Sequence, residues 1–178
     1  LRKTGVLRGN VKYVYPHYLD AFKWMSIQMD KKGLARNSRP PIWAWTSPKP
    51  DLREGGHLTR GKKGVILELE IEPQRILESN FDAWHCVLNH WYLALTDSED
   101  LSFDRKCRQR TGKKMASWKD LPSELKLEIR KSWERIFDLE HLNKSRLWKA
   151  RKGDRYIQGT LREIRISDVV NTTPFTAR

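Results

Sequence analysis

The sequence predicts an α+β fold: a single compact domain over residues 1–178, with a small mixed or antiparallel sheet and about three helices. Its length of 178 residues fits one domain and is short for two. Apolar residues recur with the period of a helix in some segments and of a strand in others. These segments follow one another without the regular alternation of a parallel α/β fold, which favours α+β.

The first part of the chain predicts strands around one helix. Alternation at 11–15 predicts a short strand, and apolar residues at helical spacing predict a helix over roughly 17–32. The aromatic run 42–46 predicts a buried strand, followed by a long proline- and glycine-containing loop at 47–64. Clean alternation at 65–72 predicts a strand with one buried face.

A second helix is expected after this strand. Ser79 or Asn80 can cap it, and its apolar stripe includes Trp84 and Trp91, which we assign to the core. The acidic run 96–104 then predicts a surface loop.

The last third of the chain predicts one long helix and two strands. Pro122 precedes a helix of about 122–139. Residues 155–166 predict a strand, in which Gly159 indicates a bulge or a close approach of another backbone. Residues 169–176 predict a last short strand.

The chain is strongly basic. Lys and Arg total 35 against 22 Asp and Glu, a net charge of +13. Residues 101–178 hold 20 of these cations and 10 of these acids, which leaves +10 in that half. Such a field attracts nucleic acids or an acidic protein partner. No apolar run approaches the ~20 residues of a membrane-spanning helix. With two cysteines and no secretory signal, the sequence predicts a cytoplasmic protein without a membrane partner.

Two segments concentrate the positive charge, 105–114 and 144–155, with six Lys or Arg each. An indole lies within or beside each segment. Cations neutralise phosphates, and indoles stack on unpaired bases. The residues expected to contact DNA or RNA are Arg105, Lys106, Arg108, Arg110, Lys113, Lys114, Trp118, Lys144, Arg146, Trp148, Lys149, Arg151 and Lys152.

His85, Cys86, His90 and Cys107 could suggest a metal site. Zinc is held by three or four such ligands in tetrahedral geometry, commonly with two of them in a close pair such as Cys-x-x-Cys. The chain has no Cys-x-x-Cys and no His-x-x-x-His pair, and indoles flank the histidines. We therefore expect core packing here and no metal site.

Several motifs occur in an order that resembles an uncharacterised domain-of-unknown-function family of bacteria and their phages. They are PIWAW (41–45), KPDLR (49–53), LELEI (67–71), SNFDAWHCVLN (79–89), SWERIFDL (132–139) and IQG (157–159). The resemblance covers almost the whole chain. It implies a further strand before Leu1, which would be missing from this chain.

The layout of that family in turn resembles ADP-ribosyltransferase-like domains. This second resemblance implies NAD as cofactor and a late polar residue, Gln158 or Glu163, in a catalytic role. The carboxylate would polarise a ribose hydroxyl and stabilise an oxocarbenium ion. Trp43, Trp45 or Tyr18 would supply the aromatic that lies against NAD.

Three functions therefore stand side by side. The first is a nucleic-acid-contacting domain, with a toxin, defence or counter-defence context in a bacterium or phage. The second is an NAD-dependent ADP-ribosyltransferase-like enzyme. The third is a module that docks an acidic protein through its basic face.

Overall fold

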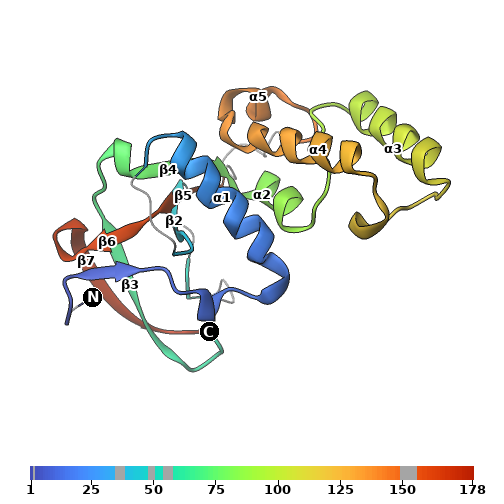
Figure 1. Cartoon of the computed structure of the whole chain (residues 1–178). Helices are drawn as coiled ribbons and strands as arrows, with labels where there is room; N and C mark the ends of the chain where they lie inside the picture. Colours follow the sequence, from blue (N-terminus) through green and yellow to red (C-terminus); the bar gives the residue numbers. More distant parts are fainter. Residues whose placement is uncertain (2, 35–38, 48–50, 54–57, 149–155) are drawn as a thin grey trace. The chain divides into compact units, whose positions relative to one another are not determined.

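The computed structural model describes residues 1, 3–34, 39–47, 51–53, 58–148 and 156–178 (Figure 1). These residues form five α-helices and seven strands, joined by short 3₁₀ turns. The α+β class is thereby confirmed, with more helices than the three or so that the sequence predicts.

The α-helices are α1 (Leu19–Lys31), α2 (Phe81–Leu88), α3 (Asp97–Thr111), α4 (Ser123–Ser132) and α5 (Leu139–Lys144). The strands are β1 (Val6–Arg8), β2 (Ile42–Ser47), β3 (Lys63–Leu69), β4 (Ile76–Asn80), β5 (Ile157–Leu161), β6 (Glu163–Arg165) and β7 (Val169–Thr176).

The strands form three small sheets, and the chain divides into two compact units. Strand β1 pairs with β6, and β3 with β7, both antiparallel. The third sheet has the order β2-β5-β4. Leu1–Glu78 and Gln158–Arg178 form one unit, here called the sheet unit, and Ser79–Ile157 form the other, the helical unit. The division into two compact units does not test the expected single domain, which stays a prediction.

In the sheet unit, α1 and the central strand β5 supply the core. Met25 and Met29 of α1 and Leu161 of β5 are fully buried. Gly159 of β5 leaves no room for a side chain: a Cβ there would lie 2.2 Å from Ile76 Cδ1 and 3.2 Å from Thr46 Cγ2. The atoms that would meet this Cβ belong to side chains and not to a neighbouring backbone, so neighbouring side chains occupy the space at this glycine.

Two ion pairs hold the C-terminal strands of the sheet unit. The buried Arg162, between β5 and β6, donates to the carboxylate of Asp30 and to the Ser26 carbonyl of α1, the latter at 2.7 Å. Arg75 donates to both carboxylate oxygens of Asp168, at 2.6 and 2.8 Å. The strand predicted over 155–166 is interrupted at Arg162, since β5 ends at Leu161 and β6 begins at Glu163.

In the helical unit, an irregular segment, Trp91–Leu95, is held by side chains. The Trp133 indole donates to the Trp91 carbonyl at 2.7 Å, and Arg135 donates to the Leu93 carbonyl at 2.6 Å. The Leu93 amide donates to Ser132 Oγ at 2.9 Å. Buried backbone groups that lie outside helices and sheets need such partners. The segment is thereby fixed against α4 and the turn that follows it.

Several local expectations are wrong, and the first is the strand at 11–15. Val11–Tyr13 form a 3₁₀ turn, in which the Asn10 side chain accepts a hydrogen bond from the Lys12 amide at 3.0 Å. This local turn competes with the strand that the alternation favours.

The acidic run 96–104 is not a loop but the start of α3. Thr96 caps the helix, since its hydroxyl accepts from the Glu99 amide at 3.2 Å. Acidic side chains in the first turn and basic ones in the last complement the helix dipole. The Thr-x-x-Glu spacing of Thr96 and Glu99 is a typical signal for the start of a helix.

Two helices end earlier than expected. Helix α2 ends at Leu88, and His90 has a left-handed backbone (φ 57°), so Trp91 leaves the apolar stripe and is 60% exposed. Helix α4 ends at Ser132, where the chain tightens into the 3₁₀ turn Trp133–Phe137. Trp84 and Trp133 are buried, as expected, and Asn80 caps α2.

The strand predicted over 65–72 is present as β3, but its buried face is not. Strands β3 and β7 form a two-stranded ribbon, with register from Lys63↔Thr176 to Leu69↔Val169. Val65 on the expected inner face is 54% exposed. The last strand, predicted at 169–176, matches β7.

Candidate nucleic-acid interface

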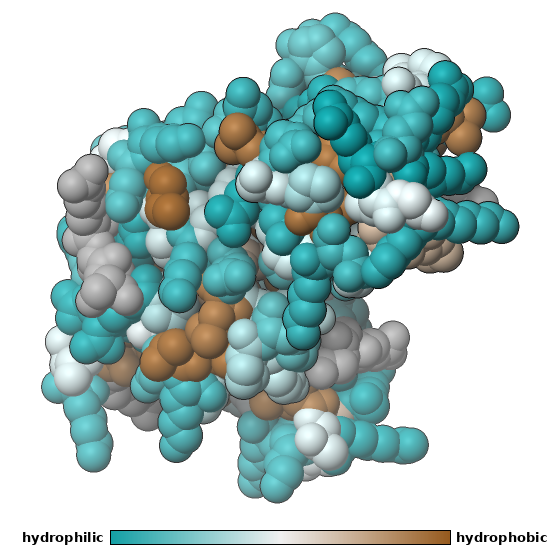
Figure 2. All heavy atoms as spheres, turned by 45° about the vertical axis from the view of Figure 1, so that its right-hand side comes forward, coloured by the Kyte–Doolittle hydropathy of each residue, from teal (hydrophilic) through white to brown (hydrophobic). Residues whose placement is uncertain are grey.

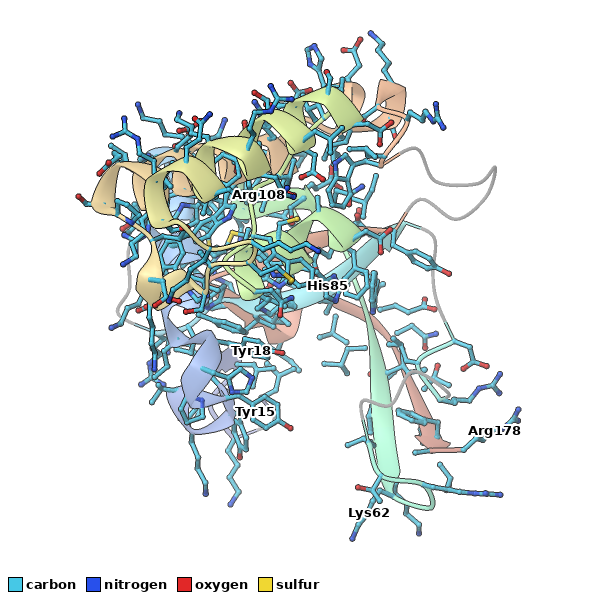
Figure 3. All side chains as sticks on the ribbon, turned by 90° about the vertical axis from the view of Figure 1, so that its right-hand side faces the viewer. Tyr15, Tyr18, Lys62, His85, Arg108 and Arg178 are labelled. Atoms are coloured by element: carbon cyan, nitrogen blue, oxygen red, sulfur yellow. The ribbon has the colours of Figure 1, made fainter. Side chains whose placement is uncertain are left out.

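The first basic segment lies at the C-terminal end of α3 and in the turn after it. We call its six cations, Arg105, Lys106, Arg108, Arg110, Lys113 and Lys114, the α3 tip. Gly112 ends the helix with a left-handed backbone (φ 67°), which turns the chain so that the segment continues beyond the helix. Figure 3 shows Arg108 on this helix.

Half of the α3 tip is compensated by carboxylates. Lys106 pairs with Glu128, Arg108 with Asp104 at 3.9 Å, and Lys113 with Asp120 at 3.0 Å. The other three cations, Arg105, Arg110 and Lys114, are exposed and have no carboxylate partner among the described residues. The positive charge of these three is therefore not offset by a nearby carboxylate of the described residues, and it can interact with an external anion.

Trp118 lies next to this tip, within an aromatic and cationic cluster. Its ring centroid lies 4.6 Å from that of His90 and 6.1 Å from that of Trp133. Lys126 Nζ and Arg130 Cζ of α4 each lie 5.7 Å from the Trp118 ring. We call these five residues the Trp118 cluster. The two cations are four residues apart, so one face of α4 presents both.

Lys126, Arg130 and Lys119 are further cations of this surface that were not predicted from the sequence. Lys119 follows Trp118 directly and is exposed, and its carbonyl accepts from Lys126 Nζ at 3.5 Å. Lys126 and Arg130 are four residues apart in the predicted helix, so the sequence indicates that they share one helix face. The sequence does not indicate that this face lies beside Trp118.

The second basic segment is only partly described. Lys144 pairs with Glu140, and Arg146 is exposed. The Trp148 indole donates to the Ala94 carbonyl at 2.6 Å, so its N–H group already has a hydrogen-bond partner within the helical unit. Lys149, Arg151 and Lys152 lie outside the described residues.

Positive charge is divided between the units differently from its division along the chain. The sheet unit holds 18 Lys and Arg against 10 Asp and Glu, a net +8. The helical unit holds 17 against 12, a net +5. Three arginines of residues 101–178, namely Arg162, Arg165 and Arg178, belong to the sheet unit. Both units therefore carry a field that attracts polyanions.

The surface seen in Figure 2 is dominated by hydrophilic side chains, with apolar residues in separate small patches. A surface of this kind is typical of electrostatic rather than hydrophobic association.

The residues of the enzyme alternative lie in the sheet unit, on different strands. Gln158 on β5 is buried, and its Nε2 has no hydrogen-bond partner among the described residues. Glu163 on β6 is bound by Arg165 at 3.0 Å and Arg8 at 2.8 Å. These guanidinium groups hold the pKa of the Glu163 carboxyl below its usual range, against the opposing effect of burial.

The aromatic side chains of that alternative lie on two elements, β2 and the start of α1. Trp43 and Trp45 lie on β2 and are half-buried. The Trp43 ring lies 5.9 Å from Phe22 of α1. Tyr18 lies at the start of α1, with its ring 4.0 Å from His17.

The cysteines show the chemistry of packed thiols. Burial raises the pKa of Cys86 to about 12, and burial also raises the pKa of Cys107. Neither is therefore a thiolate near neutral pH. Within the described part of the chain, no three His, Cys, Asp or Glu side chains gather as metal ligands would.

Fold and surface together define a small, basic α+β protein. A family model for a domain of unknown function (DUF3841) matches residues 1–170, and the chain therefore belongs to this family. Comparison with curated proteins found no match, and neither did comparison with solved structures. Among the described helices, none combines the length and apolar character needed to cross a bilayer.

Proposed function

We propose that this protein contacts DNA or RNA in the cytoplasm, and that the α3 tip with the Trp118 cluster forms the contact in the helical unit. One observation carries the proposal: Arg105, Arg110 and Lys114 are exposed at one helix end without carboxylate partners among the described residues. A cation that is not compensated within the protein gains most from a phosphate.

The α4 side of the Trp118 cluster extends this surface. Lys126 and Arg130 lie against the ring on α4, and Lys119 follows the ring in sequence. Because His90 and Trp133 already pack around Trp118, we assign this cluster mainly to the sugar-phosphate backbone. A toxin, defence or counter-defence setting in a bacterium or phage belongs to the same proposal, on the resemblance alone.

The test is fluorescence anisotropy of short labelled single-stranded and duplex DNA and RNA across a salt series. Each phosphate that is neutralised adds about 0.7–0.9 to the negative slope of log K against log salt. The triple variant Arg105→Gln, Arg110→Gln, Lys114→Gln should lower affinity and make the slope shallower by about 2–3.

The control removes the same charge from another helix, with Lys23→Gln and Lys31→Gln on α1 and Lys32→Gln directly after it. Equal losses from the two triple variants would show a general field without an interface, and would contradict the proposal. No binding at low salt would also refute it, and would direct attention to an acidic protein partner.

The geometry gives the transferase alternative less support than the nucleic-acid contact. A carboxylate that polarises a ribose hydroxyl must be open to the substrate. Glu163 is instead held by Arg8 and Arg165.

A further inference from the structure

The first residues of the sheet unit expose aromatic rings to solvent. Tyr13 is 79% and Tyr15 is 69% exposed, and Val11 beside them is 60% exposed. Large apolar side chains gathered at the surface mark contact sites more often than solitary ones do. Figure 3 shows Tyr15 and Tyr18 next to one another at the start of α1.

The rings of Tyr15, Tyr18 and the intervening His17 pack against one another. Tyr15 and His17 are stacked, with centroids 5.8 Å apart and planes at 23°. Tyr18 meets His17 at 4.0 Å and Tyr15 edge-on at 6.2 Å. We call Tyr15, His17 and Tyr18 the Tyr15 platform.

The backbone fixes the spacing of the platform. Pro16 begins the 3₁₀ turn Pro16–Tyr18, and the Tyr18 amide donates to the Tyr15 carbonyl at 2.9 Å. A ring that is ordered before binding loses less conformational entropy when a flat ligand stacks on it. The outer, solvent-facing side of Tyr15 is therefore suited to a planar group.

The charge around the platform selects an anionic ligand. Residues 1–20 contain four Lys or Arg and one acid, Asp20, and Arg8 among the four pairs with Glu163. Lys12, three residues before Tyr15, is exposed. In the same unit, Arg60 and Lys62 before β3 and Lys63 at its start are also exposed. Figure 3 shows Lys62 at that turn. Flat rings among cations match a polymer of planar bases and phosphates.

We infer that the Tyr15 platform binds unpaired bases of single-stranded nucleic acid, with Lys12 and neighbouring cations on its phosphates. This inference rests on the proposed function and adds a second contact, in the sheet unit, that selects single strands. A proline-rich peptide also docks on aromatic rings. The excess of cations, four Lys or Arg against one acid in residues 1–20, favours the polyanion.

The test compares a labelled oligothymidylate with an abasic strand of the same length, which has the same phosphates and no bases. The native protein should bind the oligothymidylate at least about fivefold more tightly, since stacking contributes about 1–3 kcal/mol per base. Tyr15→Ala should reduce this preference to near unity while leaving affinity for the abasic strand unchanged. Tyr15→Phe, which keeps the ring, should retain the preference.

The outcomes separate the two proposals. Equal binding of both strands by the native protein overturns the Tyr15 platform and leaves the phosphate interface standing. Binding of neither strand refutes the proposed function as well. A proline-rich peptide that binds and depends on Tyr15, without any dependence of oligothymidylate binding on Tyr15, assigns the platform to a peptide and also overturns the inference. Thermal unfolding of Tyr15→Ala should match the native protein, because the side chain is mostly exposed.

Discussion

Asp168 shows what a single buried charge does in this protein. Its carboxylate accepts two hydrogen bonds from Arg75 and one from the Arg165 amide at 2.7 Å. The hydrogen bonds from Arg75 are the main reason that the pKa of Asp168 lies below its usual range. The charged form is therefore the one that stabilises the fold.

We expect Asp168→Asn to lower the free energy of unfolding by about 2 kcal/mol at pH 7, since hydrogen bonds to charged groups each contribute about 1.5–3 kcal/mol. A lowered carboxyl pKa stabilises the fold above the unfolded-state pKa of about 3.9, and this stabilisation disappears as pH falls through the lower folded pKa. Urea unfolding from pH 7 to pH 3 would measure both effects.

The native protein should thus lose stability below about pH 4, and Asp168→Asn should lose less over that range. Glu140→Gln is the control, because the Lys144–Glu140 pair is well exposed and such pairs contribute little. A native protein and an Asp168→Asn variant with parallel pH profiles would contradict the assignment.

At the scale of elements, an irregular buried segment of the helical unit has its backbone groups bonded by side chains and not by a neighbouring strand. The segment Trp91–Leu95 has no strand beside it among the described residues, yet Leu93 and Ala94 are buried. Ser132 links two elements there: its hydroxyl donates to the Ile129 carbonyl at 2.7 Å and accepts from the Leu93 amide.

Ser132→Ala should leave the Leu93 amide buried without a partner and cost about 1–3 kcal/mol of unfolding free energy. Urea or thermal unfolding, followed by circular dichroism, measures the change. Ser123→Ala is the control, since Ser123 is exposed in the first turn of α4. A cost for Ser132→Ala no larger than that of the control would show that the segment is held in another way.

At the scale of the whole molecule, the net charge of +13 acts before any contact forms. Clusters of like charge accelerate the encounter with an oppositely charged polymer, and salt screens this effect within about 10 Å at 0.1 M. We therefore expect the association rate with an oligonucleotide to fall steeply as salt rises.

Stopped-flow fluorescence with oligothymidylate measures this rate. Neutralising the α3 tip should lower the association rate at low salt and have little effect at high salt. Tyr15→Ala should change the dissociation rate instead, because stacking acts only after contact. An association rate that is independent of salt would contradict electrostatic steering.

Much of the secondary structure was predictable because its signals are local. The helix at 17–32 was found from its periodicity, and the strand at 42–46 from its run of apolar and aromatic residues. Some errors occur where a side chain competes with the local pattern, as Asn10 does before the 3₁₀ turn. Others, such as the acidic start of α3, come from a local capping signal.

The candidate site was only partly predictable. The α3 tip is contiguous in sequence, so charge counting found it. Lys126 and Arg130 come to Trp118 through packing of α4 against the preceding turn, and no count along the chain reveals that.

The sequence by itself determined the fold class, the basic character and the family of this protein, because composition, periodicity and motif order are properties of the chain. Tertiary structure decided which exposed cations lack a carboxylate partner among the described residues and which form ion pairs within the fold. It also placed Arg162, Arg165 and Arg178 in the unit formed by the N-terminal residues. The physical reason is that a pair such as Lys106–Glu128 depends on a distance between residues far apart in sequence, which only folding sets. A pair such as Arg108–Asp104 is set by the helix itself.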